Sequence, residues 1–332
     1  MTFAIINMNE GDNMDAFTKV NIKYYIDEEM ELLIKEIDDN LSKIKITNQK
    51  RDNLITKAMI RSIHSSVSIE ANPLSLLDVK KILEEKEIIG DKKDIEEIKN
   101  MIEVYNNIDK YNYKSEKDFL KAHQVIINNI SSSGYRDHGE AVKMNNQIIY
   151  MAPDSLLVPE LMNSLFLYLN TNQINKLVLS AIFHYYLVSI HPFSDGNGRI
   201  ARFWMNLILI SYNNKFKFIP VDEEIYLNSE DYYKAIENSH INGNANVFIK
   251  FILKMINDSI LKTIINIGFV LNEMQNKIID LIANNGKITQ REISKVLGVS
   301  ERTVKRNFKV LIDNNIIKRI GSDKTGSWEI NY

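Results

Sequence analysis

Apolar residues recur every three or four positions along most of this chain. The segment EEMELLIKEIDDNL from residue 28 and the segment LDVKKILEEKEI from residue 77 both show this spacing. An α-helix turns once every 3.6 residues, so the spacing places the apolar side chains on one face of a helix. The pattern therefore predicts a mainly α-helical protein whose helices pack through apolar faces.

A few local signals mark helix starts and a turn. Ser115 is a suitable N-cap for the helix that follows it, and Pro159 fits the first turn of another. Residues 141 to 153, AVKMNNQIIYMAP, contain two short apolar segments on either side of two asparagines. This arrangement predicts a small β-hairpin within the helical protein.

Length and composition exclude several kinds of protein and site. A chain of 332 residues is long enough for two or three domains, and the absence of cysteine excludes disulfides, thiol nucleophiles and thiolate metal sites. The N-terminus lacks a basic segment followed by an apolar core, and the most apolar later run, LVLSAIFHYYLVSI, is too short to cross a bilayer. We therefore expect a cytoplasmic protein without membrane contact.

The stretch HPFSDGNGRIAR, residues 191 to 202, combines two closely spaced glycines with a histidine, an acid and two arginines. The helix expected over residues 176 to 190 ends at the His191-Pro192 step, because proline disfavours the helical conformation in the residue before it. Gly196 and Gly198 can bring backbone N–H groups close to a ligand, and a second helix resumes after them. The stretch therefore predicts an anion site at a helix N-terminus.

Charged side chains complete this anion site. Arg199 and Arg202 can face the same anion, and Asp195 offers the oxygen ligand that Mg²⁺ on a polyphosphate prefers. No GxxxxGK[ST] sequence is present, which excludes a Walker A loop. His191 beside the phosphates could remove the proton from an incoming hydroxyl. A metal site of His184, His191 and Asp195 is an alternative, although His184 on its apolar helix is better explained as a core residue.

The same stretch resembles, at every fixed position, the HxFx(D/E)GNGRxxR signature of the Fic family. Members of this family typically transfer AMP from ATP to a protein hydroxyl. The resemblance extends over about residues 50 to 260, because GYRDHGEAVKMNNQIIYMAP is similar to the family's target-binding flap and YYKAIENSHINGN to its later helical segment. It implies a Fic-type helical core with ATP as substrate and Mg²⁺ as cofactor.

The resemblance also implies a role for each position of the signature. His191 would be the general base, Asp195 the Mg²⁺ ligand and Phe193 a buried anchor of the loop. The nucleotide phosphates would be bound by Gly196, Asn197, Gly198, Arg199 and Arg202. The flap would align the target by strand addition through Lys143, Met144, Ile148 and Ile149.

A second resemblance lies in residues 65 to 72, SSVSIEAN. Glu70 falls on a helical face that should be buried, and a buried carboxylate needs a partner. Fic proteins of one class carry an inhibitory helix with the pattern (S/T)xxxE(G/N), which Ser66 and Glu70 match and Ala71 does not. The resemblance implies that Glu70 competes with ATP for Arg202 and keeps basal activity low, and it also allows the reverse reaction, removal of AMP. The alternative is an ordinary surface glutamate at a helix end.

Basic residues are concentrated at the C-terminal end. Residues 276 to 332 contain 11 Lys and Arg against 6 Asp and Glu, although the whole chain has a net charge of −2. Their pattern predicts three helices and two strands, with a capping box from Thr289 to Glu292 and an N-cap at Ser300. This resembles a winged helix-turn-helix whose recognition helix covers residues 300 to 314 and whose wing tip covers 321 to 326.

The outward face of the expected recognition helix gives the candidate DNA contacts. Val304, Phe308 and Leu311 form the inward stripe. The residues left for phosphate and base contacts are Arg302, Thr303, Lys305, Arg306 and Lys309. A protein-docking or dimer-stabilising wing domain is the alternative, because a surplus of five charges is modest for a nucleic-acid module.

We therefore predict three regions: an N-terminal helical region with the inhibitory helix over 1–110, a Fic catalytic core over 111–265 and a winged helix-turn-helix over 270–332. The predicted function is a self-inhibited adenylyltransferase acting on a Ser, Thr or Tyr hydroxyl of a target protein or of the chain itself. The resemblance also allows a homodimer. Two alternatives are a DNA-binding regulator whose Fic core senses nucleotide, and a Fic enzyme that transfers another phosphate-containing group such as UMP or phosphocholine.

Overall fold

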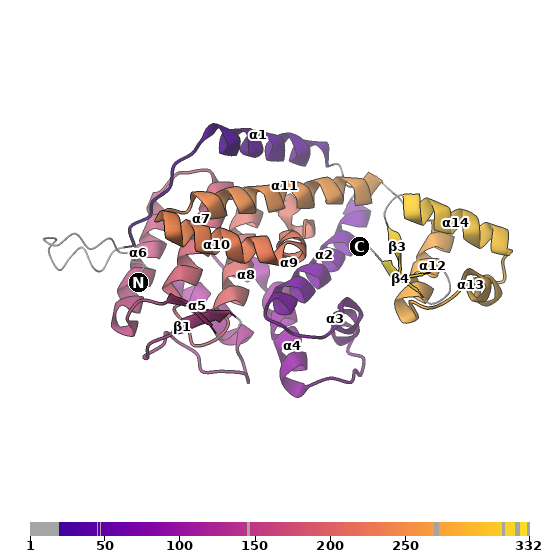
Figure 1. Ribbon diagram of the computed structural model, residues 1–332, viewed down its shortest axis with the longest axis horizontal. Coiled ribbons are helices and arrows are strands. Elements are labelled where there is room, and N and C mark those ends of the chain that lie inside the picture. Colours follow the sequence, from indigo (N-terminus) through magenta and orange to yellow (C-terminus); the bar gives the residue numbers. More distant parts are fainter. Residues whose placement is uncertain are drawn as a thin grey trace, which may run out of the picture. The chain divides into compact units, whose positions relative to one another are not determined.

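The computed structural model describes residues 20–44, 46, 48–144, 147–268, 272–313, 316–322 and 326–330. The chain divides into two compact units, Met1–Leu261 and Lys262–Tyr332. Helices make up most of both units, so the prediction of a mainly α-helical protein is confirmed (Figure 1). Within these described ranges, none of the helices has the length and apolar character needed to cross a membrane.

Two helices at the centre of the first unit position the site. α7 (Lys176–Ile190) and α8 (Asn197–Tyr212) pack against each other, and the loop between them contains the signature stretch. From Leu177 to Ile190 every residue of α7 except Val188 is buried. A helix that is apolar on nearly all faces is one that neighbours cover on all sides, and α7 is therefore the core helix of this unit.

The other helices of the first unit surround this pair. They are α1 (Glu28–Lys43), α2 (Asn48–Ile69), α3 (Leu76–Leu83), α4 (Lys92–Asn106), α5 (Glu116–Ile126), α6 (Val158–Thr171), α9 (Val221–Leu227), α10 (Ser229–Asn242) and α11 (Asn246–Gly268), which continues past the unit boundary. Short 3₁₀ turns lie at η2 (Ile108–Lys110), η3 (Ser155–Leu157) and η4 (Asn214–Phe218). The two predicted helix starts are confirmed, because the Ser115 side chain caps α5 and a proline lies in the first turn of α6.

The hairpin predicted around residues 141 to 153 is present. β1 (Ala141–Met144) pairs antiparallel with β2 (Gln147–Met151), with an irregularity between Val142 and Lys143. Four flap residues named from the sequence are in these strands, namely Lys143, Met144, Ile148 and Ile149. Their side chains lie outside what the structure describes, so their contact with a target stays a prediction.

The second unit has the arrangement predicted from the sequence. It contains α12 (Glu273–Asn284), α13 (Gln290–Leu297), α14 (Glu301–Asp313) and an antiparallel pair, β3 (Ile317–Ile320) and β4 (Ser327–Ile330). The capping box from Thr289 to Glu292 is formed, and Ser300 accepts the Thr303 N–H at 3.2 Å. The inward stripe of α14 is buried, whereas residues 323–325 of the predicted wing tip lie outside the described ranges.

Candidate active site

The backbone of His191 ends α7. It has φ 50° and ψ 60°, a left-handed conformation, and its N–H donates to the carbonyl oxygen of Leu187 at 2.9 Å. The predicted helix end at the His191-Pro192 step is therefore correct, and a left-handed turn makes it. This conformation costs a residue with a Cβ roughly 1–2 kcal/mol, so neighbouring groups must hold His191 in place.

The imidazole of His191 has one nitrogen engaged and one available. Nδ1 lies 3.4 Å from the carbonyl oxygen of Val188, which can accept a hydrogen bond only if Nδ1 carries the proton. The lone pair is then on Nε2. Burial lowers the pKa of His191, the charge of Arg136 acts in the same direction, and Glu140 and Glu70 oppose both. The net shift is downward, so His191 is a neutral base at neutral pH.

The loop between α7 and α8 is held by its own residues. The Asn197 side chain accepts a hydrogen bond from the Phe193 N–H at 3.0 Å and donates one to the Phe193 carbonyl oxygen at 2.7 Å. Gly196 has φ 81°, and a Cβ at this position would come within 2.8 Å of Ile127 Cγ2. Only glycine suits both the left-handed conformation and the close approach. The side chain of Asn197 therefore shapes the loop, and its backbone is the part left for an anion.

The first turn of α8 presents backbone N–H groups to the site. The first backbone hydrogen bond of the helix runs from the Ile200 N–H to the carbonyl oxygen of Gly196, at 2.9 Å. The N–H groups of Asn197, Gly198 and Arg199 precede it and, as at every helix start, have no acceptor within the helix. With the positive end of the helix dipole they provide the donors that the predicted anion site needs.

His123 supports the loop from α5, and sequence analysis missed it. Its ring stacks on Phe193 with 3.4 Å between ring centroids, and Nε2 lies 2.9 Å from the carbonyl oxygen of Asp195. Burial lowers the pKa of His123 to about 4, so the neutral ring donates from Nε2 and fixes the loop beside Gly196. A histidine on the buried face of a helix was the only signal in the sequence, and it does not distinguish this role from core packing.

Asp195 and Arg199 form an ion pair beside the start of α8. Oδ1 of Asp195 accepts from Arg199 Nη2 at 2.7 Å and from the Gly196 N–H at 2.6 Å. The Arg199 side chain is 3% exposed, and its Nη1 lies 3.4 Å from Glu97 Oε1. Among the residues described, Nε of Arg199 makes no hydrogen bond, and Nη1 makes only this longer ion-pair contact. Buried donors without partners are costly, and phosphate oxygens would satisfy them.

The carboxylate of Asp195 fits a magnesium ion that is bound mainly by a substrate. Its side chain is 35% exposed, and Mg²⁺ on phosphates needs only one or two protein carboxylates. The described part of the chain contains no group of three His, Asp or Glu side chains that could hold a metal. The alternative triad with His184 is therefore not formed. His184 is a buried core residue, as expected, with Nε2 2.9 Å from the hydroxyl of Tyr232.

Arg202 lies on α8 and is bound from α2. Its Nε donates to Ser66 Oγ at 2.9 Å, and its Nη2 donates to the Ser66 carbonyl oxygen at 2.9 Å and to Glu70 Oε1 at 2.7 Å. The Arg202 side chain is 1% exposed and that of Glu70 is 37% exposed. The contacts of Ser66 and Glu70 with Arg202, the second arginine of the signature, are therefore present in the structure.

Glu70 also covers the start of α8. A Cβ at Gly198 would overlap with Oε1 of Glu70 and would come within 3.1 Å of Arg202 Nη1. The carboxylate thus lies directly above the backbone that forms the anion site. It is paired with the guanidinium of Arg202 and lies against Gly198 in the first turn of α8.

α2 ends in a left-handed turn just after Glu70. Ala71 has φ 67°, its N–H donates to the Ser68 carbonyl oxygen at 3.0 Å, and the Asn72 N–H donates to that of Val67 at 3.1 Å. These two bonds define a Schellman motif, in which glycine or asparagine usually takes the left-handed position. Ala71 departs from the family pattern in residue type but adopts the conformation that the pattern favours.

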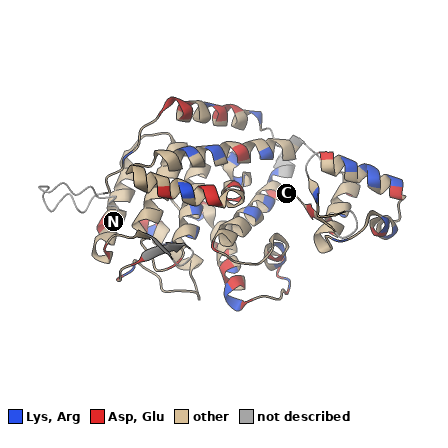
Figure 2. Ribbon diagram, in the orientation of Figure 1, with Lys and Arg blue, Asp and Glu red and all other residues tan. Residues whose placement is uncertain are grey.

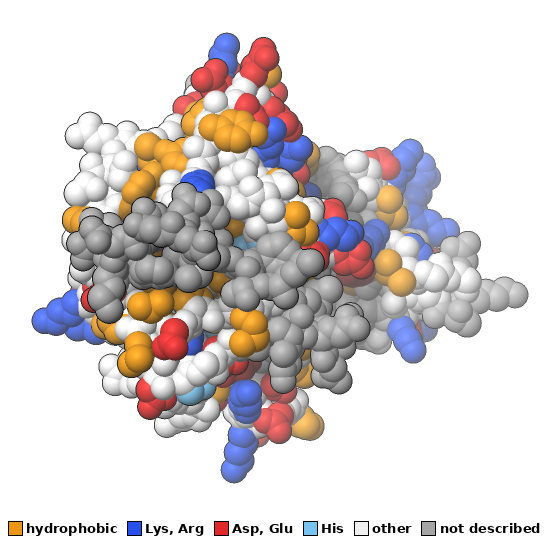
Figure 3. All heavy atoms as spheres, turned by 60° about the vertical axis from the view of Figure 1, so that its left-hand side comes forward, with side chains coloured by type: hydrophobic (Ala, Val, Ile, Leu, Met, Phe, Trp, Pro, Cys, Tyr) orange, Lys and Arg blue, Asp and Glu red, His pale blue; other side chains and the backbone are white. Residues whose placement is uncertain are grey.

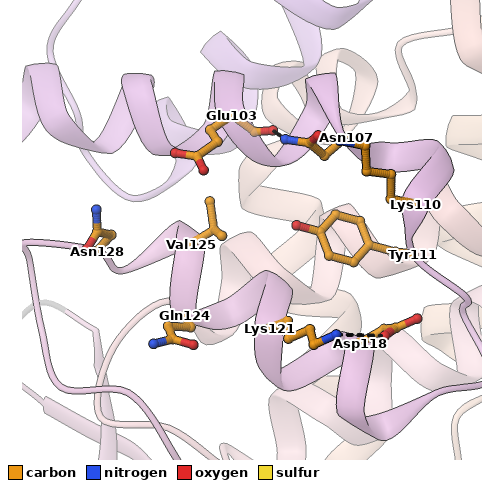
Figure 4. A pocket seen from close by; sticks show the side chains of 9 residues that line it. All are labelled: Glu103, Asn107, Lys110, Tyr111, Asp118, Lys121, Gln124, Val125 and Asn128. Carbon is orange, nitrogen blue, oxygen red and sulfur yellow. Dashed lines mark hydrogen bonds and ion pairs between the residues drawn. The ribbon is translucent and has the colours of Figure 1, made fainter.

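A separate hollow of about 480 Å³ lies between α4, η2 and α5 (Figure 4). It is lined by Glu103, Asn107, Lys110, Tyr111, Asp118, Lys121, Gln124, Val125 and Asn128. Lys121 pairs with Asp118 at 3.9 Å, and Asn107 donates to the Glu103 carbonyl oxygen at 2.9 Å. None of these residues belongs to the predicted site.

In the second unit, α14 carries the predicted DNA contacts. Lys and Arg recur along this helix (Figure 2), and Arg302, Lys305, Arg306 and Lys309 are exposed. On the face of the protein seen in Figure 3, by contrast, the described side chains of both charge signs are interspersed. Thr303 is half-buried, and its hydroxyl lies 2.9 Å from that of Ser300 at the start of the helix. The four exposed cations form the outward face, and Thr303 contributes to the cap.

Known proteins match both units. Residues 113–209 match the Fic/DOC family, and residues 271–318 match the family described as winged helix-turn-helix DNA-binding. The crystal structure of a Fic family protein from Desulfovibrio desulfuricans G20 aligns over 94% of this chain and 98% of its own, with 26% identity and a TM-score of 0.72. Residues 113–209 are therefore similar to a Fic domain. The match includes the whole signature stretch, and the end of α2 with Ser66 and Glu70 lies before the region matched to the Fic/DOC family.

Curated relatives of this chain are named as adenylyltransferases. "Protein adenylyltransferase Fic" of Aedes aegypti is 30% identical over 188 residues, which are 52% of this chain and 36% of the relative. "Probable protein adenylyltransferase aq_aa38" of Aquifex aeolicus is 28% identical over 201 residues, which are 54% of this chain and 56% of the relative. The chain spans less than two thirds of the length of either relative.

Proposed function

We propose that this Fic-domain protein transfers AMP from ATP to a Ser, Thr or Tyr hydroxyl of a target protein or of itself. The observation that carries the proposal is the available Nε2 of a neutral His191, in the same loop as the anion site of α8. A protein that only senses nucleotide needs the anion site but no base beside it. The names of the curated relatives support the same class of reaction.

In the proposed reaction Nε2 of His191 takes the proton of the target hydroxyl. The hydroxyl oxygen forms a bond to the α-phosphorus of ATP, and the bond from this phosphorus to the oxygen bridging to the β-phosphate breaks. Pyrophosphate leaves. The N–H groups at the start of α8 and the guanidinium of Arg199 stabilise the charge that develops on the phosphates. When bound, Mg²⁺ on Asp195 would neutralise part of the negative charge of the leaving pyrophosphate.

The proposal includes inhibition by Glu70. Its carboxylate and the γ-phosphate of ATP are both negative, and both need Arg202 and the space above Gly198. ATP can bind in the productive position only when Glu70 has moved away. Basal transfer is therefore low, and removal of this carboxylate raises it.

Labelling with α-³²P-ATP and Mg²⁺ tests transfer and inhibition together. The protein samples are wild type, Glu70→Gly, His191→Ala and the double variant. We expect more label on protein with Glu70→Gly than with wild type, and none with either His191→Ala protein. The matched control is Glu85→Gly, which removes a glutamate at the end of α3 that makes no contact with Arg202 in the described structure. Absence of label in the Glu70→Gly protein would overturn the proposal.

The identity of the donor separates AMP transfer from the alternative, a Fic enzyme that transfers UMP or phosphocholine. The Glu70→Gly protein is incubated with γ-labelled ATP, with α-labelled UTP and with labelled CDP-choline. Label from α-labelled ATP alone supports AMP transfer. Label from UTP or CDP-choline in preference to ATP shows a Fic enzyme that transfers a different group.

For the second unit we propose contact with DNA through the exposed cations of α14. The support is the family match over 271–318 together with the exposed, basic outward face. A gel shift at rising salt tests it, because phosphate contacts release counterions and the affinity must fall as salt increases. A fall in affinity with salt, reduced by substituting Lys305, supports DNA binding. Absence of binding at low salt favours the protein-docking alternative.

A further inference from the structure

Arg136 lies just before the flap and has an unusual set of partners. It is 4% exposed, although arginine is seldom buried without an acidic partner. Its Nε donates to the carbonyl oxygen of His191 at 2.8 Å, and its Nη2 is 3.5 Å from that of Ile190. Its backbone N–H donates to the carbonyl oxygen of Pro192 at 2.9 Å. Three successive residues at the end of α7 are thus bound by one residue.

The same guanidinium holds both ends of the flap. Nη1 donates to the carbonyl oxygen of His138 at 2.7 Å, before β1, and Nη2 donates to that of Pro153 at 2.5 Å, after β2. The two ends are also joined directly, because the Ala152 N–H donates to the Glu140 carbonyl oxygen at 3.1 Å. The base of the hairpin and the backbone of the predicted general base therefore share one anchor.

We propose that Arg136 is a positioning residue that sets the target-binding hairpin relative to the imidazole of His191. The inference rests on the proposed function, since it assigns to Arg136 the alignment of the target hydroxyl with Nε2. A hairpin that binds a target by strand pairing fixes the hydroxyl only as well as the hairpin itself is fixed. Arg136 also holds the left-handed backbone of His191, which is unfavourable without support.

The geometry requires arginine. A guanidinium has five donors in a rigid plane and can reach carbonyl groups in several directions, whereas lysine has three donors at a single point. The carbonyl groups of Ile190 and His191 are at the C-terminal end of α7, where the helix dipole favours a cation. Glu140 and Asp154 provide the nearby negative charge. Lysine at position 136 would keep the charge and lose most of the hydrogen bonds.

The role separates from nucleotide binding, because Arg136 makes no contact with the start of α8 among the described residues. In a Glu70→Gly background, we expect Arg136→Lys to lower the rate of self-labelling at saturating ATP by about ten- to hundredfold, as expected when a reacting group is displaced by about 1 Å. The KM for ATP should stay within about twofold of the parent value, because the anion site is unchanged. A variant that also disturbed the anion site would raise the KM for ATP.

Charge and geometry can be separated with a second variant. The charged groups that act on His191 are Arg136, which lowers its pKa, and Glu140 and Glu70, which raise it. Arg136→Met should therefore move the acidic limb of the pH–rate profile to higher pH, whereas Arg136→Lys should leave the limb in place. Hydrogen exchange provides a readout that needs no activity. Amides of residues 138 to 153 should exchange faster in both variants, and those of α8 should not.

The control is Arg291→Lys, at a side chain that is 76% exposed in the second unit. It should match the parent in rate, KM and exchange. If the Glu70→Gly parent itself shows no label, the proposed function fails. If the parent is labelled and Arg136→Lys has the same rate and the same flap exchange, the role of Arg136 is refuted while the proposed function stands. A variant that unfolds, as shown by its melting curve, is replaced in the comparison by the other variant.

Discussion

Ala71→Gly should strengthen the end of α2, the helix whose Glu70 we propose to be inhibitory. Ala71 is exposed and has φ 67°, so glycine there removes steric strain without losing buried surface. The two Schellman hydrogen bonds of this turn are made by backbone groups and do not depend on the side chain. Glu70, which binds Arg202, is the residue directly before this turn.

The size of the effect follows from two opposing terms. A left-handed alanine costs about 1–2 kcal/mol, and glycine costs about 0.5–1 kcal/mol more in conformational entropy on folding. The net gain is therefore about 0.5–1 kcal/mol, which corresponds to a rise in melting temperature of roughly 1–4 °C for a unit of this size. If this gain stabilises the inhibited state alone, basal transfer falls about two- to fivefold.

Thermal melts and α-³²P-ATP labelling measure the two effects, and Glu85→Gly is the control. Glu85 has φ 56° at the end of α3, its N–H donates to the Ile82 carbonyl oxygen at 3.0 Å, and the Lys86 N–H donates to that of Lys81 at 2.9 Å. The same motif is thus present away from Arg202. Both variants should melt higher than wild type, and only Ala71→Gly should lower basal labelling.

Two results would contradict this reasoning. A lower melting temperature for Ala71→Gly would show that the turn is not strained in wild type. An equal rise in melting temperature for both variants, with unchanged labelling by Ala71→Gly, would show that the turn does not control the position of Glu70.

Three further predictions concern pH, buried charge and DNA. Because burial lowers the pKa of His191, the acidic limb of the pH–rate profile of Glu70→Gly should lie below pH 6.5, with activity lost as His191 gains a proton; a limb above this value contradicts the assignment. Burial raises the pKa of Asp222 to about 6, so the folded state binds this proton more tightly and stability falls as the pH rises from about 4 through 6. In wild type the free energy of unfolding should fall by on the order of 3 kcal/mol between pH 4 and pH 7, and Asp222→Asn should remove this fall. Urea unfolding at the two pH values measures it, and an unchanged pH dependence in Asp222→Asn contradicts the prediction. Lys305→Ala should lower the slope of log affinity against log salt by about 1 in DNA binding, and an unchanged slope argues against a phosphate contact there.

The chemistry of the site could be predicted from consecutive residues. His191, Asp195 and Arg202 lie within one stretch of twelve residues, and helix periodicity on both sides fixes their order around the loop. The pairing of Arg202 with Glu70 followed from the resemblance to the (S/T)xxxE(G/N) pattern. Helix periodicity alone predicted a buried carboxylate, and this was wrong, because the Glu70 side chain is 37% exposed. What the pattern could not give was the conformation of Ala71, since the sequence departs from the family at that residue.

His123 and Arg136 could not be predicted as parts of the site. Each donates to a backbone carbonyl group in the loop after α7, more than fifty residues away, and every residue has such a carbonyl group whatever its type. Arg136 follows a glycine and a tyrosine in a segment with several charged residues, where a solvated side chain is the ordinary expectation. Only the folded chain brings its guanidinium to the end of α7.

The amino-acid sequence alone determined the helical class, the anion-binding loop and the types of group that surround it, because these depend on neighbours within a few positions along one helix or turn. Tertiary structure decided which nitrogen of His191 is available, how the loop is supported and where the flap is anchored. These properties depend on burial and on hydrogen bonds between distant segments, and neither is defined until the chain has folded.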